Sequence, residues 1–288
     1  MRWRPGGVSS DLEDRRGQGF GGGPGIRIGL GGAVVLLVLS LVTGQNFFAI
    51  LGQGDGTVNE GDGQPAPYQS TPEENQLVQF VSFVLDDVQD TWAKLLPAAG
   101  RDYRRAKLVL FTDSVSSACG NAASAMGPFY CPLDEKVYVD LGFYNELKRR
   151  FGAPGDFAQA YVIAHEIGHH VQHQLGISER VRSAQEARPD QANALSVRLE
   201  LQADCLAGVW GHSTEQRNIL EAGDVEEALG AAAAIGDDRI QRGAGAGVNR
   251  ETWTHGSSRQ RVAWFRQGLE SGRLEACDTY KTRLPDEG

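Results

Sequence analysis

The chain has 288 residues, of which 41% are hydrophobic and 23% are charged, and its formal net charge is −9. This length allows one sizeable globular domain with extensions. The acidic balance argues against a nucleic-acid partner, which would need a basic surface.

Glycine-rich or polar segments flank an uncharged apolar run near the start of the chain. Residues 1–27 and 52–72 have compositions that bury no core, so we expect a flexible tail and a flexible linker. The apolar run at 28–51 has 24 residues. Because ~20 apolar residues are enough to cross a bilayer as a helix, we predict a transmembrane anchor over 28–51.

Two other interpretations of this run stay open. A signal peptide usually has an apolar region of roughly 7–15 residues that ends at a cleavage site between small residues. The run is longer, and LVTGQ matches such a site poorly. A buried core helix is the second alternative, although the glycine-rich flanks offer it little to pack against.

The charges around the run predict its orientation. Five arginines lie within residues 1–27, whereas the first charged residues after the run are acidic. Because positive residues are retained on the cytoplasmic side of a membrane, we expect residues 1–27 in the cytoplasm. The folded domain, over residues 73–288, should then lie in a periplasmic or other extracytoplasmic compartment.

The first half of this domain predicts one long helix followed by strands. Thr71 can cap a helix, and Pro72 suits its first turn. Residues 107–113 form an apolar run that predicts a strand, and residues 127–144 predict a hairpin turning at 132–135. We expect its second strand, 136–141, to be a sheet edge along which an extended peptide could pair.

The second half of the domain predicts mainly helices. The candidate segments are 156–175, 190–211, 224–241 and 257–272. Asp156 can cap the first of them and Gly176 can end it, and Ser257 or Ser258 can open the last. The pattern predicts an α+β fold that is mostly helical, with a small antiparallel sheet.

All four cysteines follow the apolar run, and none forms a C-x-x-C pair. We therefore expect neither a thiolate zinc site nor a thioredoxin-like site. Disulfides are typical of compartments outside the cytoplasm. Cys119 and Cys131 flank a short loop and should join, which leaves Cys205 for Cys277, and free buried thiols are the alternative.

Four of the six histidines lie in YVIAHEIGHHVQHQLG, residues 161–176. His165 and His169 are four residues apart, so on a helix their side chains share one face, ~5–6 Å apart, where both can bind one Zn²⁺. Glu166 lies beside them and can act as a base toward a metal-activated water. The spacing predicts a zinc site with chemistry, and a solvated histidine-rich face is the alternative.

Such a site needs a third protein ligand. A metzincin would have glycine and histidine where this chain has Gln172 and Leu175, so that class is excluded. The segment RLELQADCLAG offers Glu200, which completes a His₂Glu set with one open position. Asp204, one turn later, could accept the free ring N–H of a ligand histidine. Other candidates for the third ligand are His173, Glu186, Asp204, His212 and His255.

Longer segments of the chain resemble the bacterial putative neutral zinc metallopeptidase family. They include ACGNAASAMGPFYCPLDEKVYVDLGFY, AYVIAHEIGHHVQHQLG, RLELQADCLAGVW and HGSSRQRVAWFRQGLESG, and the resemblance covers nearly the whole chain. It implies a membrane-anchored, zincin-like peptidase of the glutamate-zincin type. The third ligand in that type comes from an E-x-x-x-D segment, here Glu200 to Asp204. The resemblance implies no particular substrate.

Together these features predict a zinc endopeptidase anchored in the bacterial cytoplasmic membrane. One Zn²⁺ per chain would be held by His165, His169 and Glu200, with Glu166 as general base. The partners would be a peptide or protein substrate and the membrane. The alternative is a zinc-stabilised envelope binding or assembly protein without turnover, which would need the ligands but not Glu166.

His255 is a candidate for stabilising the oxyanion of the reaction. It lies in ETWTHGSSRQR, between a glycine-rich loop and a helix start, where active-site groups are common. Gly256 would let the backbone come close, and Arg261 is a second candidate donor. A surface histidine in a loop is the alternative. His212 is expected at the polar end of a helix.

Overall fold

The computed structural model describes residues 1–18, 68–149, 151–245, 247–282 and 284–285. The predicted anchor at 28–51 and most of the predicted linker lie outside these residues. Within them, no helix is both long enough and apolar enough to cross a bilayer.

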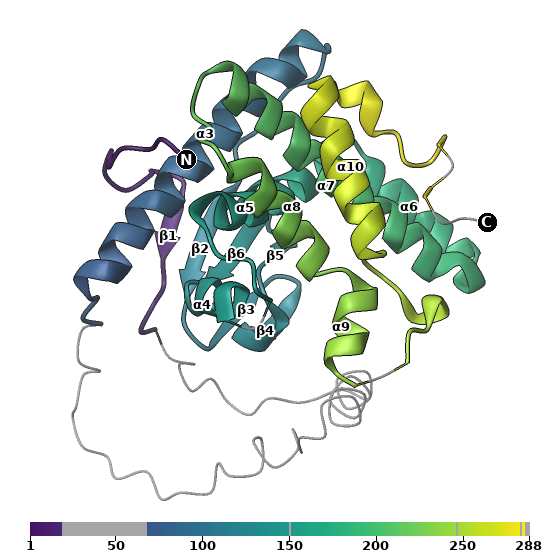
Figure 1. Ribbon diagram of the computed structural model, residues 1–288, viewed down its shortest axis with the longest axis horizontal. Coiled ribbons are helices and arrows are strands. Elements are labelled where there is room, and N and C mark those ends of the chain that lie inside the picture. Colours follow the sequence, from purple (N-terminus) through teal and green to yellow (C-terminus); the bar gives the residue numbers. More distant parts are fainter. Residues whose placement is uncertain (19–67, 150, 246, 283, 286–288) are drawn as a thin grey trace, which may run out of the picture. The chain divides into compact units, whose positions relative to one another are not determined.

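A four-stranded sheet forms one layer of the fold (Figure 1). Its order is β1 (Leu12–Asp14), β2 (Lys107–Phe111), β6 (Lys136–Asp140) and β5 (Phe129–Cys131). β1 and β6 both pair with β2 in parallel, and β5 pairs with β6 antiparallel. A separate hairpin joins β3 (Ser114–Ser117) to β4 (Gly120–Ala123).

Two predictions about the sheet are wrong. The sheet is mixed rather than antiparallel, because only the predicted hairpin β5–β6 runs antiparallel within it. β6 is not an edge, because it is hydrogen-bonded to β2 on one side and to β5 on the other. Consecutive buried residues along β2, Leu108 to Phe111, show that this strand is covered on both faces, as parallel strands usually are.

Helices make up most of the remaining described chain, so the predicted α+β class is confirmed. They are α3 (Pro72–Ala98), α4 (Gly142–Arg149), α5 (Asp156–Gln174), α6 (Ile177–Ala187), α7 (Ala192–Gln216), α8 (Asp224–Ala234), α9 (Asp237–Gly243) and α10 (Ser258–Ser271). Short 3₁₀ turns cover Ser124–Met126, Pro189–Gln191, Arg250–Thr252 and Leu274–Cys277. α5 lies at the centre and packs against α3, α7, α8 and the sheet (Figure 1).

Local sequence explains the helix ends, with three differences from prediction. Thr71 forms a capping box with Glu74 at the start of α3, and Ser257 forms another at α10. α5 is capped by Gly155 instead of Asp156, and α7 continues past His212 to Gln216. The predicted helix 224–241 is broken at Gly236, where a side chain would press into the backbone of Ser258, so the chain turns there.

The contact between α7 and α10 is unusually close. A Cβ added at Gly268 would lie 1.9 Å from the Cys205 carbonyl oxygen, and one at Gly208 would lie 2.1 Å from the Phe265 carbonyl oxygen. Only glycine permits two helix backbones to approach so closely. Cys205 is also joined to Cys277, and Cys119 is joined to Cys131, which are the predicted pairings.

The N-terminal residues correct the predicted domain boundaries. Residues 1–17 belong to the same compact unit as the chain from Ser70 onward, rather than to a separate flexible tail. β1 adds a strand to the sheet, and the Asp11 carboxylate accepts hydrogen bonds from Arg105 Nε at 2.5 Å and Lys107 Nζ at 2.8 Å. The ammonium group of Met1 lies 2.7 Å from Asp156 Oδ1, at the start of α5.

This docking also bears on membrane topology. A strand that is hydrogen-bonded to β2 must occupy the same compartment as β2. The predicted arrangement, with residues 1–27 in the cytoplasm and the domain outside, stays a prediction, and the contacts of β1 and Asp11 bear on it.

Asp11→Asn should lower the free energy of unfolding by about 1.5–3 kcal/mol, because charge-assisted hydrogen bonds to a nearly buried carboxylate are lost. Asp90→Asn is the matched control, since Asp90 pairs with the same Arg105 but its side chain is 61% exposed. That change should cost under about 1 kcal/mol. Urea unfolding at pH 7 measures both, and equal effects would contradict the docking of residues 1–17.

The Asp11 contribution should also depend on pH. Burial raises the pKa of Asp11, but hydrogen bonds from Lys107 and Arg105 outweigh burial and lower the pKa. The stabilisation is therefore complete above the unfolded-state pKa of about 3.9 and is lost as the pH falls through the lower folded-state pKa. Stability of Asp11→Asn should lack this loss in acid.

Candidate metal centre

Two helices bring three candidate ligands together. α5 carries His165 and His169, and α7 carries Glu200. His165 Nε2 lies 3.2 Å from Glu200 Oε2, and His169 Nε2 lies 3.4 Å from Glu200 Oε1. Ligand atoms about 2.0–2.1 Å from a tetrahedral zinc would be about 3.3 Å apart. The spacing of these donor atoms therefore fits one Zn²⁺.

The predicted partner of a ligand histidine is in place, and it is part of a larger buried network. Asp204 Oδ1 lies 2.9 Å from His165 Nδ1 and accepts a hydrogen bond from Tyr161 at 2.5 Å. Arg261, from α10, donates to both oxygens of Asp204, at 2.8 and 2.9 Å. Arg261 thus lies behind the histidine and neutralises Asp204, and it does not act as the free donor that the sequence suggested.

The charges of the site favour a cation. Three carboxylates, on Glu166, Glu200 and Asp204, face one guanidinium, on Arg261. Burial lowers the pKa of His165, but hydrogen bonds to Asp204 and Glu200 outweigh it and raise the pKa to about 10. The site therefore attracts positive charge, and a bound metal would have to displace protons from the histidines.

Glu166 lies beside these ligands in an unusual state for a carboxylate. It is 7% exposed, and burial raises its pKa above the ordinary value. No hydrogen bond or ion pair joins its side chain to the residues that the structure describes. A buried carboxylate without such partners destabilises a fold, so its presence next to the histidines favours a functional role over a structural one.

Sequence reasoning missed the partner of His169. Gln172 Oε1 lies 2.9 Å from His169 Nδ1, and the Gln172 side chain is fully buried. Gln172 entered the prediction only because a metzincin would have glycine at this position. The signal was available in the helical spacing, because residues three apart on a helix are neighbours.

His255 lies in a loop that is held against α9 and α7. Backbone N–H groups of Thr254, His255 and Gly256 all donate to Asp237 Oδ2, and His255 Nδ1 lies 3.3 Å from Asp237 Oδ1. Gly256 has a φ of +87°, and a Cβ there would lie 3.1–3.3 Å from side chains of α7. The close backbone approach expected at Gly256 is therefore present.

The imidazole of His255 is half exposed. Its pKa is raised, first by the hydrogen bond to Asp237 and further by the charge of Glu200. Asp237 begins α9, and its partnership with His255 was not foreseen. The sequence predicts Asp237 in the interior of a helix 224–241, where its carboxylate could not accept hydrogen bonds from the loop of His255.

The other candidates for a third ligand lie elsewhere. His173 Nε2 lies 3.7 Å from Glu135, and His212 Nδ1 lies 2.7 Å from the Leu269 carbonyl oxygen. Glu186 is exposed on α6. Among the described residues, a second acidic group consists of Asp156, Asp224 and Glu227, and two of its members, Asp156 and Asp224, contact the Met1 ammonium.

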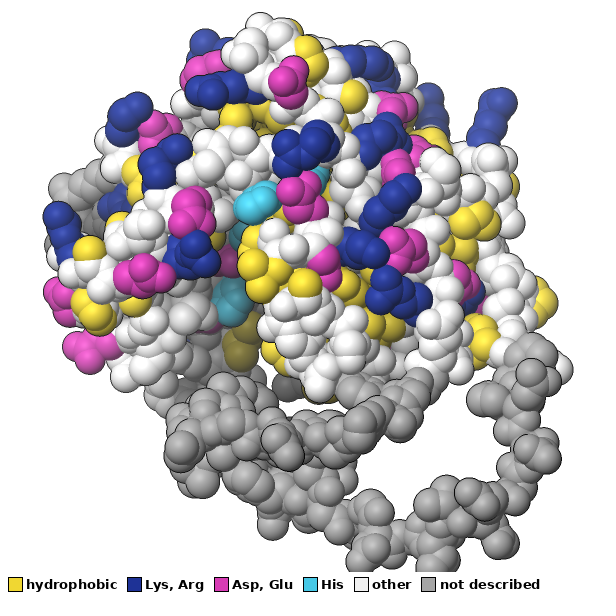
Figure 2. Space-filling model, turned by 180° about the vertical axis from the view of Figure 1, so that it is seen from behind, with side chains coloured by type: hydrophobic (Ala, Val, Ile, Leu, Met, Phe, Trp, Pro, Cys, Tyr) yellow, Lys and Arg dark blue, Asp and Glu magenta, His cyan; other side chains and the backbone are white. Residues whose placement is uncertain are grey.

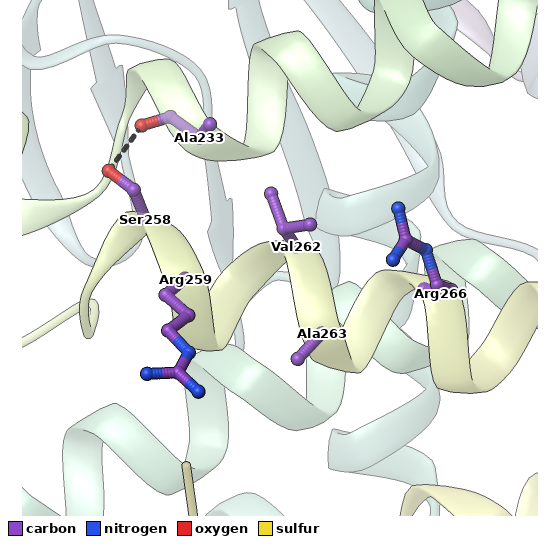
Figure 3. A pocket seen from close by; sticks show the side chains of 6 residues that line it. All are labelled: Ala233, Ser258, Arg259, Val262, Ala263 and Arg266. Atoms are coloured by element: carbon purple, nitrogen blue, oxygen red, sulfur yellow. Dashed lines mark hydrogen bonds between the residues drawn. The ribbon is translucent and has the colours of Figure 1, made fainter. Parts of the chain in front are cut away.

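The metal centre is partly open to solvent, because the side chains of His169 and Glu200 are 16% and 19% exposed. Figure 2 shows histidine side chains in a hollow on one face of the molecule. A different pocket lies between α8 and α10 (Figure 3). Its lining residues include no metal ligand or base, so it is not the chemical site; they are Ala233, Ser258, Arg259, Val262, Ala263 and Arg266.

Known proteins resemble this chain over most of its length. The model of a family described as "Putative neutral zinc metallopeptidase" matches residues 1–280. The chain belongs to this family. The family's zinc-peptidase description suggests a zinc-dependent peptidase, and the match includes the N-terminal residues that form β1.

Relatives of this chain match it over 68–97% of its length. It is 46% identical over 285 residues to "Uncharacterized protein YpfJ" of Escherichia coli (strain K12), covering 97% of this chain and 99% of the relative. It is 43% identical over 206 residues to "Uncharacterized protein Mb2605" of Mycobacterium bovis, covering 68% of each. No solved structure matches the chain.

Proposed function

We propose that this protein is a zinc-dependent endopeptidase with one Zn²⁺ per chain. The observation that carries the proposal is the group of His165, His169 and Glu200, whose donor atoms lie within 4.8 Å of one another beside the buried, unpaired Glu166. Family membership supports the same class of reaction.

The two histidines and Glu200 would hold the metal. Bound Zn²⁺ would polarise the scissile carbonyl and make the attacking water acidic. Glu166 would accept a proton from that water and later deliver it to the leaving amine. The raised pKa of Glu166 suits this exchange, because a carboxylate that binds a proton more tightly is a better base near neutral pH. Asp204 would keep the His165 ring oriented.

His255 would donate a hydrogen bond to the oxyanion that forms when water adds to the carbonyl. Asp237 accepts from His255 Nδ1, which turns Nε2 away from Asp237 and leaves it free to act as that donor. The half-exposed position of the ring in the loop beside α7 gives it access to a substrate.

A binding or assembly protein stabilised by zinc is the alternative, and it would also use the three ligands. It would have no use for a buried carboxylate without a partner. Glu166 is therefore the residue whose variants distinguish the two functions.

Glu166→Gln should retain about one zinc per chain and lose cleavage of casein or peptides, because the ligands remain and the base is gone. Glu200→Ala should lose the metal. Elemental analysis and a protease assay on the full chain, with and without chelator, measure both. Glu186→Gln, the same change on an exposed surface, should behave as wild type. Full activity of Glu166→Gln, or tightly held zinc in Glu200→Ala, would contradict these assignments.

His255→Ala should lower kcat by ~100-fold and leave KM and zinc content nearly unchanged, because the lost contact forms only in the transition state. His212→Ala is the control, since its side chain contacts the Leu269 carbonyl at the end of α10. Steady-state kinetics of the two variants decide the assignment. A wild-type kcat in His255→Ala would show that His255 is a surface histidine without a part in the reaction.

We also propose that the domain and residues 1–17 lie together outside the cytoplasm, which a single crossing of the membrane at 28–51 would not allow. Both disulfides support an oxidising compartment, and the docked β1 requires that the N-terminal residues share it. This proposal replaces the predicted cytoplasmic position of residues 1–17.

Single cysteines at Val8 and Leu133, which are 63% and 68% exposed, should both react with a membrane-impermeant maleimide in cells whose outer layer is permeable. Labelling before and after lysis provides the comparison, with a cytoplasmic protein as control. Reaction at only one of the two positions would refute a shared compartment. Reaction at both positions only after lysis would place the domain in the cytoplasm.

A further inference from the structure

The two ligand histidines are supported by chemically different partners. His165 has the Asp204 carboxylate, which Arg261 neutralises. His169 has the side-chain amide of Gln172, at 2.9 Å. An amide can present either an oxygen or an NH₂ group, so the tautomer of His169 depends on which way Gln172 is turned.

The surroundings of Gln172 leave one orientation. Its Nε2 lies 2.7 Å from the Leu199 carbonyl oxygen and 3.1 Å from Gln202 Oε1. A backbone carbonyl can only accept, so the NH₂ group must face Leu199. The Gln172 oxygen then faces His169, whose Nδ1 must carry the proton. Nε2 is the other ring nitrogen, and it faces Glu200 Oε1, 3.4 Å away, on the side of the metal centre.

Gln202 is fixed in the same manner. Its Nε2 donates to the Cys277 carbonyl oxygen at 2.8 Å, so its own oxygen must face Gln172. Cys277 is held to α7 through its disulfide with Cys205. Gln172, Gln202 and Cys277 are 0%, 6% and 1% exposed, which keeps water from replacing these partners. The Cys277 carbonyl thus fixes the orientation of the Gln202 amide. Gln202 in turn fixes the amide of Gln172, which decides the ring nitrogen of His169 that carries the proton.

We propose that Gln172 is a positioning residue for the metal centre and that Gln202 acts through it. Together they hold His169 as the Nδ1–H tautomer with Nε2 toward the zinc, as outer partners of metal ligands commonly do. The inference rests on the proposed zinc site but not on peptidase turnover. Leu199 and Gln202 both accept from the amide, so a carboxylate at position 172 could not make these contacts, which explains why an amide suits this place.

Substitution by methionine keeps the length of each side chain and removes its hydrogen bonds. Gln172→Met should release zinc to an excess of chelator ~10–100-fold faster than wild type. Gln202→Met should accelerate release by a smaller factor. Gln174→Met is the control, because Gln174 lies on the same helix and bonds to the backbone of Arg104 instead of to a ligand. Its zinc release should match wild type.

The double variant separates positioning from a general loss of stability. If Gln202 acts only through Gln172, then Gln172→Met/Gln202→Met should release zinc no faster than Gln172→Met alone. ¹⁵N spectra of zinc-loaded protein with labelled histidine should show a protected Nδ1–H on His169 that Gln172→Met loses. Neither result follows from destabilised packing alone, and thermal unfolding of the metal-free variants measures that packing separately.

Wild-type release of zinc from Gln172→Met, or a double variant whose acceleration is the product of the two single effects, would overturn the inference. If Gln172→Met does not fold, Gln202→Met still decides, since it must release zinc faster than Gln174→Met. A wild-type protein that binds no zinc would instead refute the proposed function. Zinc binding without proteolysis would refute the peptidase and leave the inference intact.

Discussion

The buried pair of Asp204 and Arg261 is the interaction on which the metal centre depends. Removing two charges from water is costly unless geometry and hydrogen bonds compensate, and here both oxygens of Asp204 accept from Arg261 while one also accepts from Tyr161. Burial raises the pKa of Asp204, but the charges and hydrogen bonds of Arg261 and His165 together outweigh burial and lower the pKa. The carboxylate therefore stays ionised and can orient His165. Loss of either partner alone would leave a buried charge, at a cost of about 3–5 kcal/mol.

The close packing of α7 and α10 makes this pair possible. Arg261 reaches Asp204 because Gly208 and Gly268 let the two helix backbones approach within van der Waals contact. The Cys205–Cys277 disulfide holds the turn after α10 to the same helix. That turn supplies the carbonyl that orients Gln202 and, through it, Gln172. Arg261 of α10 thus supports His165 through the charged Asp204. The segment after α10 supports His169 through the neutral amides of Gln202 and Gln172.

The N-terminal residues connect the metal centre to the rest of the chain. β1 completes one side of the sheet, and Met1 reaches the first turns of α5 and α8. α5 carries both histidines, so the segment that docks on its start belongs to the scaffold of the site. Residues 1–17 and the chain from Ser70 onward therefore have to stay in contact in any membrane-attached form of the protein.

The sequence by itself determined what depends on neighbours along the chain. Helical spacing gave the His165–His169 pair, capping residues gave the starts of α3 and α10, and a short turn gave the β5–β6 hairpin. The E-x-x-x-D segment gave Glu200 and Asp204 as candidates. Only the tertiary structure decided the docking of β1, the break at Gly236 and the partnerships of Arg261, Gln172 and Asp237. Except for the local contact of Gln172, these depend on segments far apart in sequence, and the amide direction of Gln172 is itself set by Cys277 through a fold that no local pattern encodes.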